Sequence, residues 1–156
     1  MKPLQIALLL LVAVVLSGCK SEPEFAQVSG TITKNGEPMN LVEVRFVPVD
    51  GALNRYNGFG ITDDEGNYTI AIPGRDDKVC CVGKCKVTLR EGPMPDELRA
   101  NLESNDRSIS RKADHEMKKF KASLKNRPIP RDYLRLHSTP LMADVTNGEF
   151  EFPIEL

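Results

Sequence analysis

Residues 58–74, GFGITDDEGNYTIAIPG, have the pattern of two antiparallel strands joined by a turn. The turn falls at Asp63 and Gly66, because an Asp side chain accepts hydrogen bonds from the backbone that follows it and Gly adopts the positive φ of tight turns. After the turn, every second position holds a large apolar side chain: Tyr68, Ile70 and Ile72. This period of two predicts a strand with one buried face, which other strands must cover because a lone hairpin is marginal in water.

Five other stretches alternate in the same way, and they span residues 28–33, 41–49, 84–90, 141–145 and 150–154. The turn signal Asn35-Gly36 predicts that the first two of these stretches pair as a hairpin. We therefore expect a mainly β fold, in the form of a seven-stranded antiparallel β-sandwich. A chain of 156 residues has room for one such domain with its own core.

Residues 93–127 interrupt the strand pattern and predict a helical insertion before the last two strands. Its second helix carries one apolar stripe at helical spacing: Ile109, Ala113, Met117, Phe120 and Leu124. Residues 107–127 hold eight Lys or Arg against two acidic residues, whereas the rest of the chain after residue 18 carries a net charge of −8. We expect Met117, Phe120 and Leu124 to pack on the sandwich, with the basic face in water. The alternative is a helix that binds a partner.

The first 18 residues have the layout of an export signal, with a charged start, an apolar run and small residues before Cys19. The run is shorter than the roughly 20 residues that a membrane-spanning helix needs. Leu16-Ser17-Gly18-Cys19 resembles the bacterial lipobox, in which the Cys is lipidated and becomes the first residue of the mature protein. We expect a signal peptide over residues 1–18, a lipidated tether over residues 19–27 and a domain over residues 28–156. The domain would then lie outside the cytoplasm, on the inner or the outer membrane.

Cys80, Cys81 and Cys85 are the least ordinary cluster in the domain. Thiols of an exported protein can oxidise, and the short segment before Cys85 allows a turn that brings it against Cys80 or Cys81. We expect a structural disulfide between Cys85 and one of these two, with one thiol left over. Three soft ligands can also hold Cu(I) or Zn²⁺, although no fourth Cys or His is near in sequence. A metal-binding or thiol-redox protein of the envelope is therefore the alternative function.

No motif in the sequence indicates catalysis. The two histidines, His115 and His137, are not combined with a Ser or Cys in a nucleophile motif, and we expect both at the surface. The carboxylates at residues 63–65 lack the spacing of a calcium loop, so turn formation explains them. A formal net charge of −1 gives no general reason to expect nucleic acid. We therefore expect no enzymatic activity, no cofactor and no bound metal.

Three stretches resemble a known family: residues 28–49, VSGTITKNGEPMNLVEVRFVPV; residues 61–74, ITDDEGNYTIAIPG; and residues 139–156, TPLMADVTNGEFEFPIEL. They look like carboxypeptidase regulatory-like domains, in particular those of small bacterial lipoproteins that are common in planctomycetes. The resemblance implies a transthyretin-like sandwich of seven strands. It implies no activity, because the matching positions are turn and core residues. Transthyretin-like hydroxyisourate hydrolases end in Tyr-Arg-Gly-Ser, whereas this chain ends in Phe-Pro-Ile-Glu-Leu.

These patterns together predict a lipid-anchored, non-catalytic binding or structural module of the cell envelope. Its expected contacts are the membrane, through the lipid on Cys19, and an envelope protein or polysaccharide. No nucleic acid is expected as a partner.

Overall fold

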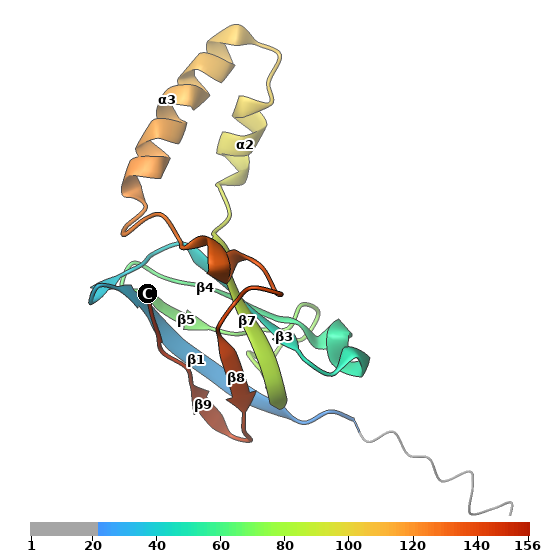
Figure 1. The fold of residues 1–156 in the computed structure, drawn as a ribbon. Helices are drawn as coiled ribbons and strands as arrows, with labels where there is room; N and C mark the ends of the chain where they lie inside the picture. The colour runs from blue at the N-terminus through green and yellow to red at the C-terminus, as the bar shows by residue number, and fades with distance from the viewer. Residues whose placement is uncertain (1–21) are drawn as a thin grey trace, which may run out of the picture.

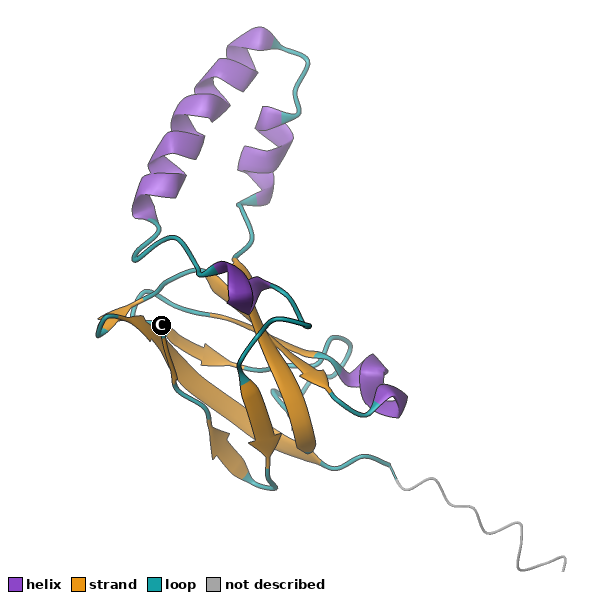
Figure 2. Ribbon diagram, viewed as in Figure 1, coloured by secondary structure: helices purple, strands orange, loops and turns teal. Residues whose placement is uncertain are grey.

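The computed structural model describes residues 22–156, which form two facing β-sheets and a helical hairpin at one end (Figure 1). The first sheet is built around β1 (Phe25–Lys34) and also contains β2 (Glu37–Pro38), β5 (Asn67–Thr69), β6 (Cys80–Cys81), β9 (Glu149–Glu151) and β10 (Ile154–Glu155). The second sheet has the order β4 (Gly58–Ile61), β3 (Val42–Pro48), β7 (Gly83–Glu91) and β8 (Met142–Val145). The helical segments are η1 (Gly51–Tyr56), α2 (Asp96–Leu102), α3 (Arg107–Ser123) and η2 (Arg131–Leu134) (Figure 2).

The mainly β prediction is confirmed, but the strand count differs from seven. Residues 22–156 contain ten strands, because β2 and β6 have two residues each and are too short for alternation to reveal. In addition, the predicted strand at residues 150–154 is divided into β9 and β10, with Pro153 between them. Proline has no N–H to donate to a ladder. Both strands pair in parallel with β1, so the first sheet is mixed.

The core lies between the two sheets and is filled by the inward-facing positions of their strands. Its fully buried side chains include Val28, Ile32, Val42, Val44, Phe46, Ile70, Val87 and Leu89. The three alternating residues after the turn, predicted to face inward, are at most 3% exposed. Burying a large apolar side chain stabilises a fold by about 1.5–3 kcal/mol relative to leaving it in water. This burial accounts for the alternation seen in the sequence.

The two predicted hairpins cross between the sheets instead of pairing along their length. β1 turns back only into β2, and the chain then bends at Leu41, which has a φ of 47°, before β3 joins the second sheet. In the same way, β4 pairs with β3 and β5 pairs with β1, while a single bridge joins Phe59 to Ala71. Crossing between the sheets lets each arm keep its apolar face in the shared core. The prediction that residues 28–33 pair with residues 41–49 is therefore wrong.

A contact between Tyr68 and Phe152 fixes the C-terminal segment on β1. The Tyr68 hydroxyl donates a hydrogen bond to the Phe152 carbonyl oxygen, and burial raises the pKa of this phenol, which keeps it protonated as a donor. Gly30 lies beside this contact. A Cβ at position 30 would stand 2.3 Å from the Phe152 oxygen and 2.8 Å from the Tyr68 oxygen. The close approach of two backbone segments therefore requires glycine at this position.

We expect Gly30→Ala to lower the free energy of unfolding by about 1–3 kcal/mol, because the new methyl group must displace the Phe152 backbone. Tyr68→Phe should lower it by about 1 kcal/mol through the lost hydrogen bond. Urea unfolding followed by circular dichroism measures both effects. Gly51→Ala is the matched control, since a Cβ there would have no neighbour closer than 3.9 Å. Equal unfolding midpoints for the variants at positions 30 and 51 would contradict the conclusion that position 30 requires glycine.

The helical insertion forms a hairpin in which α3 lies against α2 and both project away from the sheets (Figures 1 and 2). In the apolar stripe, Ala113 is fully buried, and Leu98 of α2 is 7% exposed. Met117, Phe120 and Leu124 are half-buried. Ile109, at the start of the stripe, is 40% exposed. The prediction that the stripe packs on the sandwich is therefore wrong, because α3 packs against α2 instead. No helix within residues 22–156 is long and apolar enough to cross a membrane.

Candidate functional site

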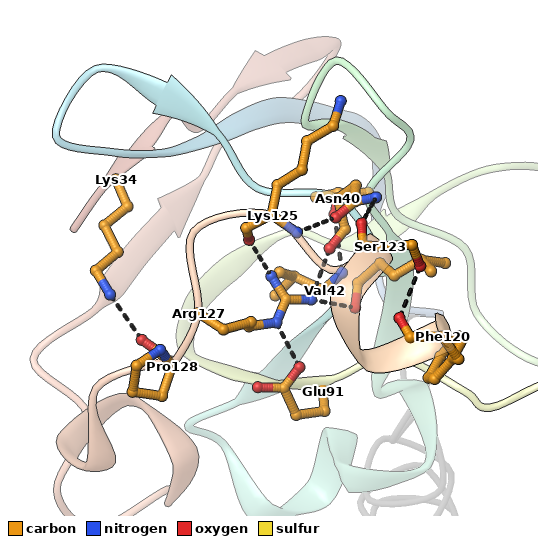
Figure 3. A network of polar contacts seen from close by, with 11 residues as sticks. Lys34, Asn40, Val42, Glu91, Phe120, Ser123, Lys125, Arg127 and Pro128 are labelled. Atoms are coloured by element: carbon orange, nitrogen blue, oxygen red, sulfur yellow. Dashed lines mark hydrogen bonds and ion pairs between the residues drawn. The ribbon is translucent and has the colours of Figure 1, made fainter. Parts of the chain in front are cut away.

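The base of the helical hairpin is held to the sandwich by a network of polar contacts, which Figure 3 shows from close by. Asn40, 4% exposed, lies at its centre. Its side-chain nitrogen donates to the Ser123 carbonyl oxygen at 3.3 Å and to an Asp64 carboxylate oxygen at 3.1 Å. Its side-chain oxygen accepts from the Lys125 backbone N–H at 2.8 Å. One buried amide therefore ends α3 and attaches it to the turn between β4 and β5.

Arg127 joins the two points at which the chain leaves and re-enters the sandwich. Its guanidinium donates to the carbonyl oxygens of Asn40 at 2.6 Å, Leu41 at 3.0 Å and Lys125 at 2.8 Å. It also pairs with Glu91, the last residue of β7, at 2.5 Å. The Arg127 side chain is only 14% exposed, so its bonds to the carbonyl oxygens are shielded from water and strengthened, whereas the Glu91 carboxylate is 51% exposed and faces solvent.

Three further side chains bond to backbone carbonyl oxygens around the same base. Lys34 donates to Pro128, Lys125 to Asp64 and Asn126 to Pro38, at distances of 2.8–2.9 Å. We call these contacts, together with those of Asn40 and Arg127, the hairpin base network. Because it draws on both sheets and on the segment after α3, it fixes the direction in which the hairpin projects.

We expect Arg127→Met to lower the free energy of unfolding by about 2–3 kcal/mol, since it removes several hydrogen bonds from a charged donor and leaves buried carbonyl oxygens unpaired. The hairpin should also become sensitive to trypsin, because its base is released. Chemical denaturation and timed proteolysis measure the two effects. Arg131→Met, at an exposed position, is the control. If both variants resist trypsin as the wild type does, the base network does not hold the hairpin.

The outer surface of α3 is strongly basic. The helix has six Lys or Arg, and all of them are exposed: Arg107, Arg111, Lys112, Lys118, Lys119 and Lys121. Asp106 caps the helix by accepting from the Ser108 N–H at 2.7 Å, and its hydrogen bonds to Ser108 lower the pKa of this carboxyl. Capping fixes the first turn of a helix that would otherwise fray. The hairpin thus presents its cations on a well-defined rod.

A polar groove of about 670 Å³ lies on the outer face of the first sheet. Neighbouring strands β1, β5 and β9 and the loop before β6 line it with hydroxyl, amide and charged groups: Gln27, Ser29, Thr69, Asp77, Lys78, Glu149 and Glu151. Such a lining can hydrogen bond to a polar ligand. The sequence patterns do not predict this groove. Its residues come from four separate segments, and they face outward, whereas the alternation that predicts the strands depends on the inward-facing residues.

The cysteines lie where the chain crosses from the first sheet to the second. Cys80 is on β6 and Cys85 on β7, and both belong to the central core, with 0% and 1% of their surface exposed. The crossing is made at Gly83, whose φ of 115° suits glycine. Cys81 is also buried but is not part of that core. The structure therefore sets Cys80, rather than Cys81, against Cys85 in the core.

The Cys85 thiol donates a long hydrogen bond to the Cys81 backbone carbonyl oxygen. Interaction with the Cys85 thiol, together with burial, raises the pKa of Cys80, and interaction with Cys80 lowers the pKa of Cys85. All three thiols are reduced in the structure. Reactive cysteines lie in partly exposed, electropositive surroundings, whereas this pair lies in an apolar core. The arrangement suits a structural cross-link better than thiol chemistry on a substrate.

We expect Cys80 and Cys85 to form the disulfide of the exported protein and Cys81 to stay free. Alkylation before and after reduction, followed by mass spectrometry, identifies the paired residues. In Cys81→Ser the bond should persist, whereas Cys80→Ser should leave Cys85 open to alkylation after unfolding. Because the loop between the two residues is so short, the entropic gain should be smaller than the roughly 3 kcal/mol of a 15-residue loop. Three freely alkylated thiols in the exported wild type would rule out the bond.

The other predicted site residues lie apart from one another. Asp63 accepts from the backbone N–H groups of Glu65 and Asn67 at 3.0 and 2.8 Å, so it serves the turn that Gly66 completes. His115 on α3 and His137 after η2 are both exposed. Within residues 22–156, no three His, Cys, Asp or Glu side chains gather as a metal site requires. Cys19, the predicted lipidation site, lies outside the residues that the structure describes.

No protein-family model matches the chain, and no curated protein matches it. Among solved structures, it is similar to the crystal structure of a DUF3823 family protein from Parabacteroides merdae. The two chains are 13% identical, and the similarity covers 86% of this chain and 46% of that one with a TM-score of 0.43. This chain thus spans less than half the length of that protein. The resemblance to carboxypeptidase regulatory-like domains stays a hypothesis.

Proposed function

We propose that this protein is a lipid-anchored, non-catalytic binding module on the outer side of a bacterial membrane. Its scaffold would be a transthyretin-like sandwich of the carboxypeptidase regulatory-like type, and its binding element the helical hairpin. The observation that carries the proposal is the position of that hairpin, which projects from one end of the sandwich while β1 begins at the other (Figure 1).

The length of β1 gives the distance between the two ends of the sandwich. Phe25, at the start of β1, pairs with Cys81, whereas Lys34, at its end, bonds to Pro128 beside the hairpin base. Ten residues of extended strand span about 30 Å. α3 has 17 residues, so the hairpin extends up to about 25 Å further. With a lipid on Cys19, the hairpin would be the part of the domain farthest from the anchor.

The non-catalytic part of the proposal is supported by the surroundings of the reactive groups. The two exposed histidines lie on separate parts of the chain: one is on the hairpin, and the other follows η2. The core thiols are almost completely buried, so a substrate dissolved in water could not reach them. The hairpin, in contrast, offers charged surface on a rigid support, as a binding element requires.

The test replaces residues 95–121 by a short Gly-Ser linker in the full-length chain and compares its envelope partners with those of the wild type. The variant keeps Asn40, Ser123, Lys125 and Arg127, so the sandwich retains these contacts of the hairpin base network. Cells producing either protein are cross-linked, and bound material is recovered through a C-terminal tag. We expect the wild type to retain one or more envelope components that the linker variant loses.

Two controls separate binding from anchoring. Cys19→Ala should take up no labelled fatty acid and should not be processed at this site, while the purified protein still binds the recovered component. The linker variant should keep its lipid and its cooperative unfolding. The proposed function is wrong if the linker variant recovers the same components as the wild type, and the anchor is wrong if the wild type takes up no fatty acid.

A further inference from the structure

The exposed side of α3 carries cations without any acidic residue among them. At 100° per residue, the apolar stripe centres on the buried Ala113, and the opposite side of the helix carries Arg107, Arg111, Lys112, Lys118 and Lys119. We call these five residues the basic face. The two acidic residues of α3, Asp114 and Glu116, fall at its edges. The basic face therefore runs along most of a rod about 25 Å long.

The side chains of the basic face form no ion pair or hydrogen bond with the residues that the structure describes, 22–156. Among residues 22–156, the ion pairs are Arg75–Asp77, Arg99–Asp96 and Arg127–Glu91, and none involves α3. No hydrogen bond of a basic-face side chain is found in the same part of the chain. Arg107 and Arg111 are also four residues apart, a spacing at which like charges destabilise a helix. Asp114 and Lys118, at the same spacing, attract each other, so α3 combines repelling and attracting pairs, and its surplus positive charge is exposed to solvent.

The surroundings of the basic face favour one class of partner. Its one aromatic ring is the imidazole of the exposed His115, because Phe120 is on the stripe. One small ring cannot stack a series of successive bases, as single-strand binding grooves do. Part of the stripe packs against α2, and Ile109 is the exposed large apolar residue of α3, so the helix offers less apolar surface than an interfacial helix that inserts into lipid. Protein interfaces have apolar or aromatic centres and few Lys residues, unlike this face. A flexible polymer with regularly spaced anionic groups, in contrast, can bind to a row of cations alone, without an apolar centre or a stacking platform.

We propose that the basic face of α3 binds an anionic polysaccharide, with Arg side chains pairing with carboxylate or sulfate groups and Lys side chains acting as point charges. This inference rests on the proposed function, because it names the class of ligand that the hairpin would bind outside the cell. The linear arrangement of the cations suits an extended chain that lies along the helix. Its binding weakens as salt rises, since the contacts release bound counterions.

The test uses the full chain in neutral detergent with two defined polymers, heparin and polygalacturonate, and with neutral dextran as the uncharged control. The variant Arg111→Gln, Lys112→Gln, Lys118→Gln, Lys119→Gln removes four charges and keeps residues of good helix propensity. The matched control, Lys84→Gln, Arg90→Gln, Arg131→Gln, Arg135→Gln, removes four exposed charges from outside α3 and outside the polar groove. Unfolding curves confirm that both variants fold.

We expect affinity for both anionic polymers to fall by about tenfold or more in the α3 variant and by no more than about twofold in the control, because only the former loses direct contacts. Dextran should not bind. Equal losses in the two variants, or no binding by the wild type, would overturn the proposal. Tighter binding to duplex DNA or to anionic lipid vesicles at the same salt would also overturn it. With any of these outcomes, the proposed function would still hold if the wild type recovers an envelope component that the linker variant loses.

Discussion

The structure depends on the guanidinium of Arg127, which bonds to three backbone carbonyl oxygens and to Glu91 at the junction of sandwich and hairpin. A helical hairpin attached by two chain segments alone would swing freely. A planar, charged group with several donors removes that freedom, because it satisfies oxygens on both sides of the junction at once. The fixed direction of α3 and the distance of its cations from the start of β1 both follow from this contact.

The hairpin base network also explains how oppositely charged parts of one chain stay apart. Residues 107–127 carry a net charge of +6, and the rest of the chain after residue 18 carries −8, so α3 is attracted to the sandwich. Collapse onto it would require release of the buried Asn40 and Arg127 contacts, and an unpaired buried polar group is costly. Attraction between exposed charges is weak and screened by salt. The buried contacts therefore determine the position of the helix, and the cations of α3 stay open to solvent.

Local patterns in the sequence predicted the strands and the helices, because period and turn chemistry act over a few residues. Tyr68, Ile70 and Ile72 face inward as their alternation predicts. The same patterns could not identify partners. Alternation does not tell which sheet β3 joins, and an apolar stripe shows that α3 has a covered face but not that α2 covers it. Asn40 and Arg127 gave no signal at all, since they bond mainly to backbone oxygens, which every residue carries.

The cysteines and the hairpin base network lie at opposite ends of β1, and each connects the two sheets. Cys80 is on the strand that pairs with Ala26 near the start of β1, while Cys85 is on β7 of the second sheet. A bond between them would hold the sheets together at the end where β1 begins. If the chain is anchored through Cys19 as proposed, any pull on the anchor would act first on β1 and its partner β6. Hydrogen bonds suffice at the hairpin end because Asn40 and Arg127 are shielded from water. The end where β1 begins has no comparable buried polar network among residues 22–156, which is a physical reason for a covalent link at that position.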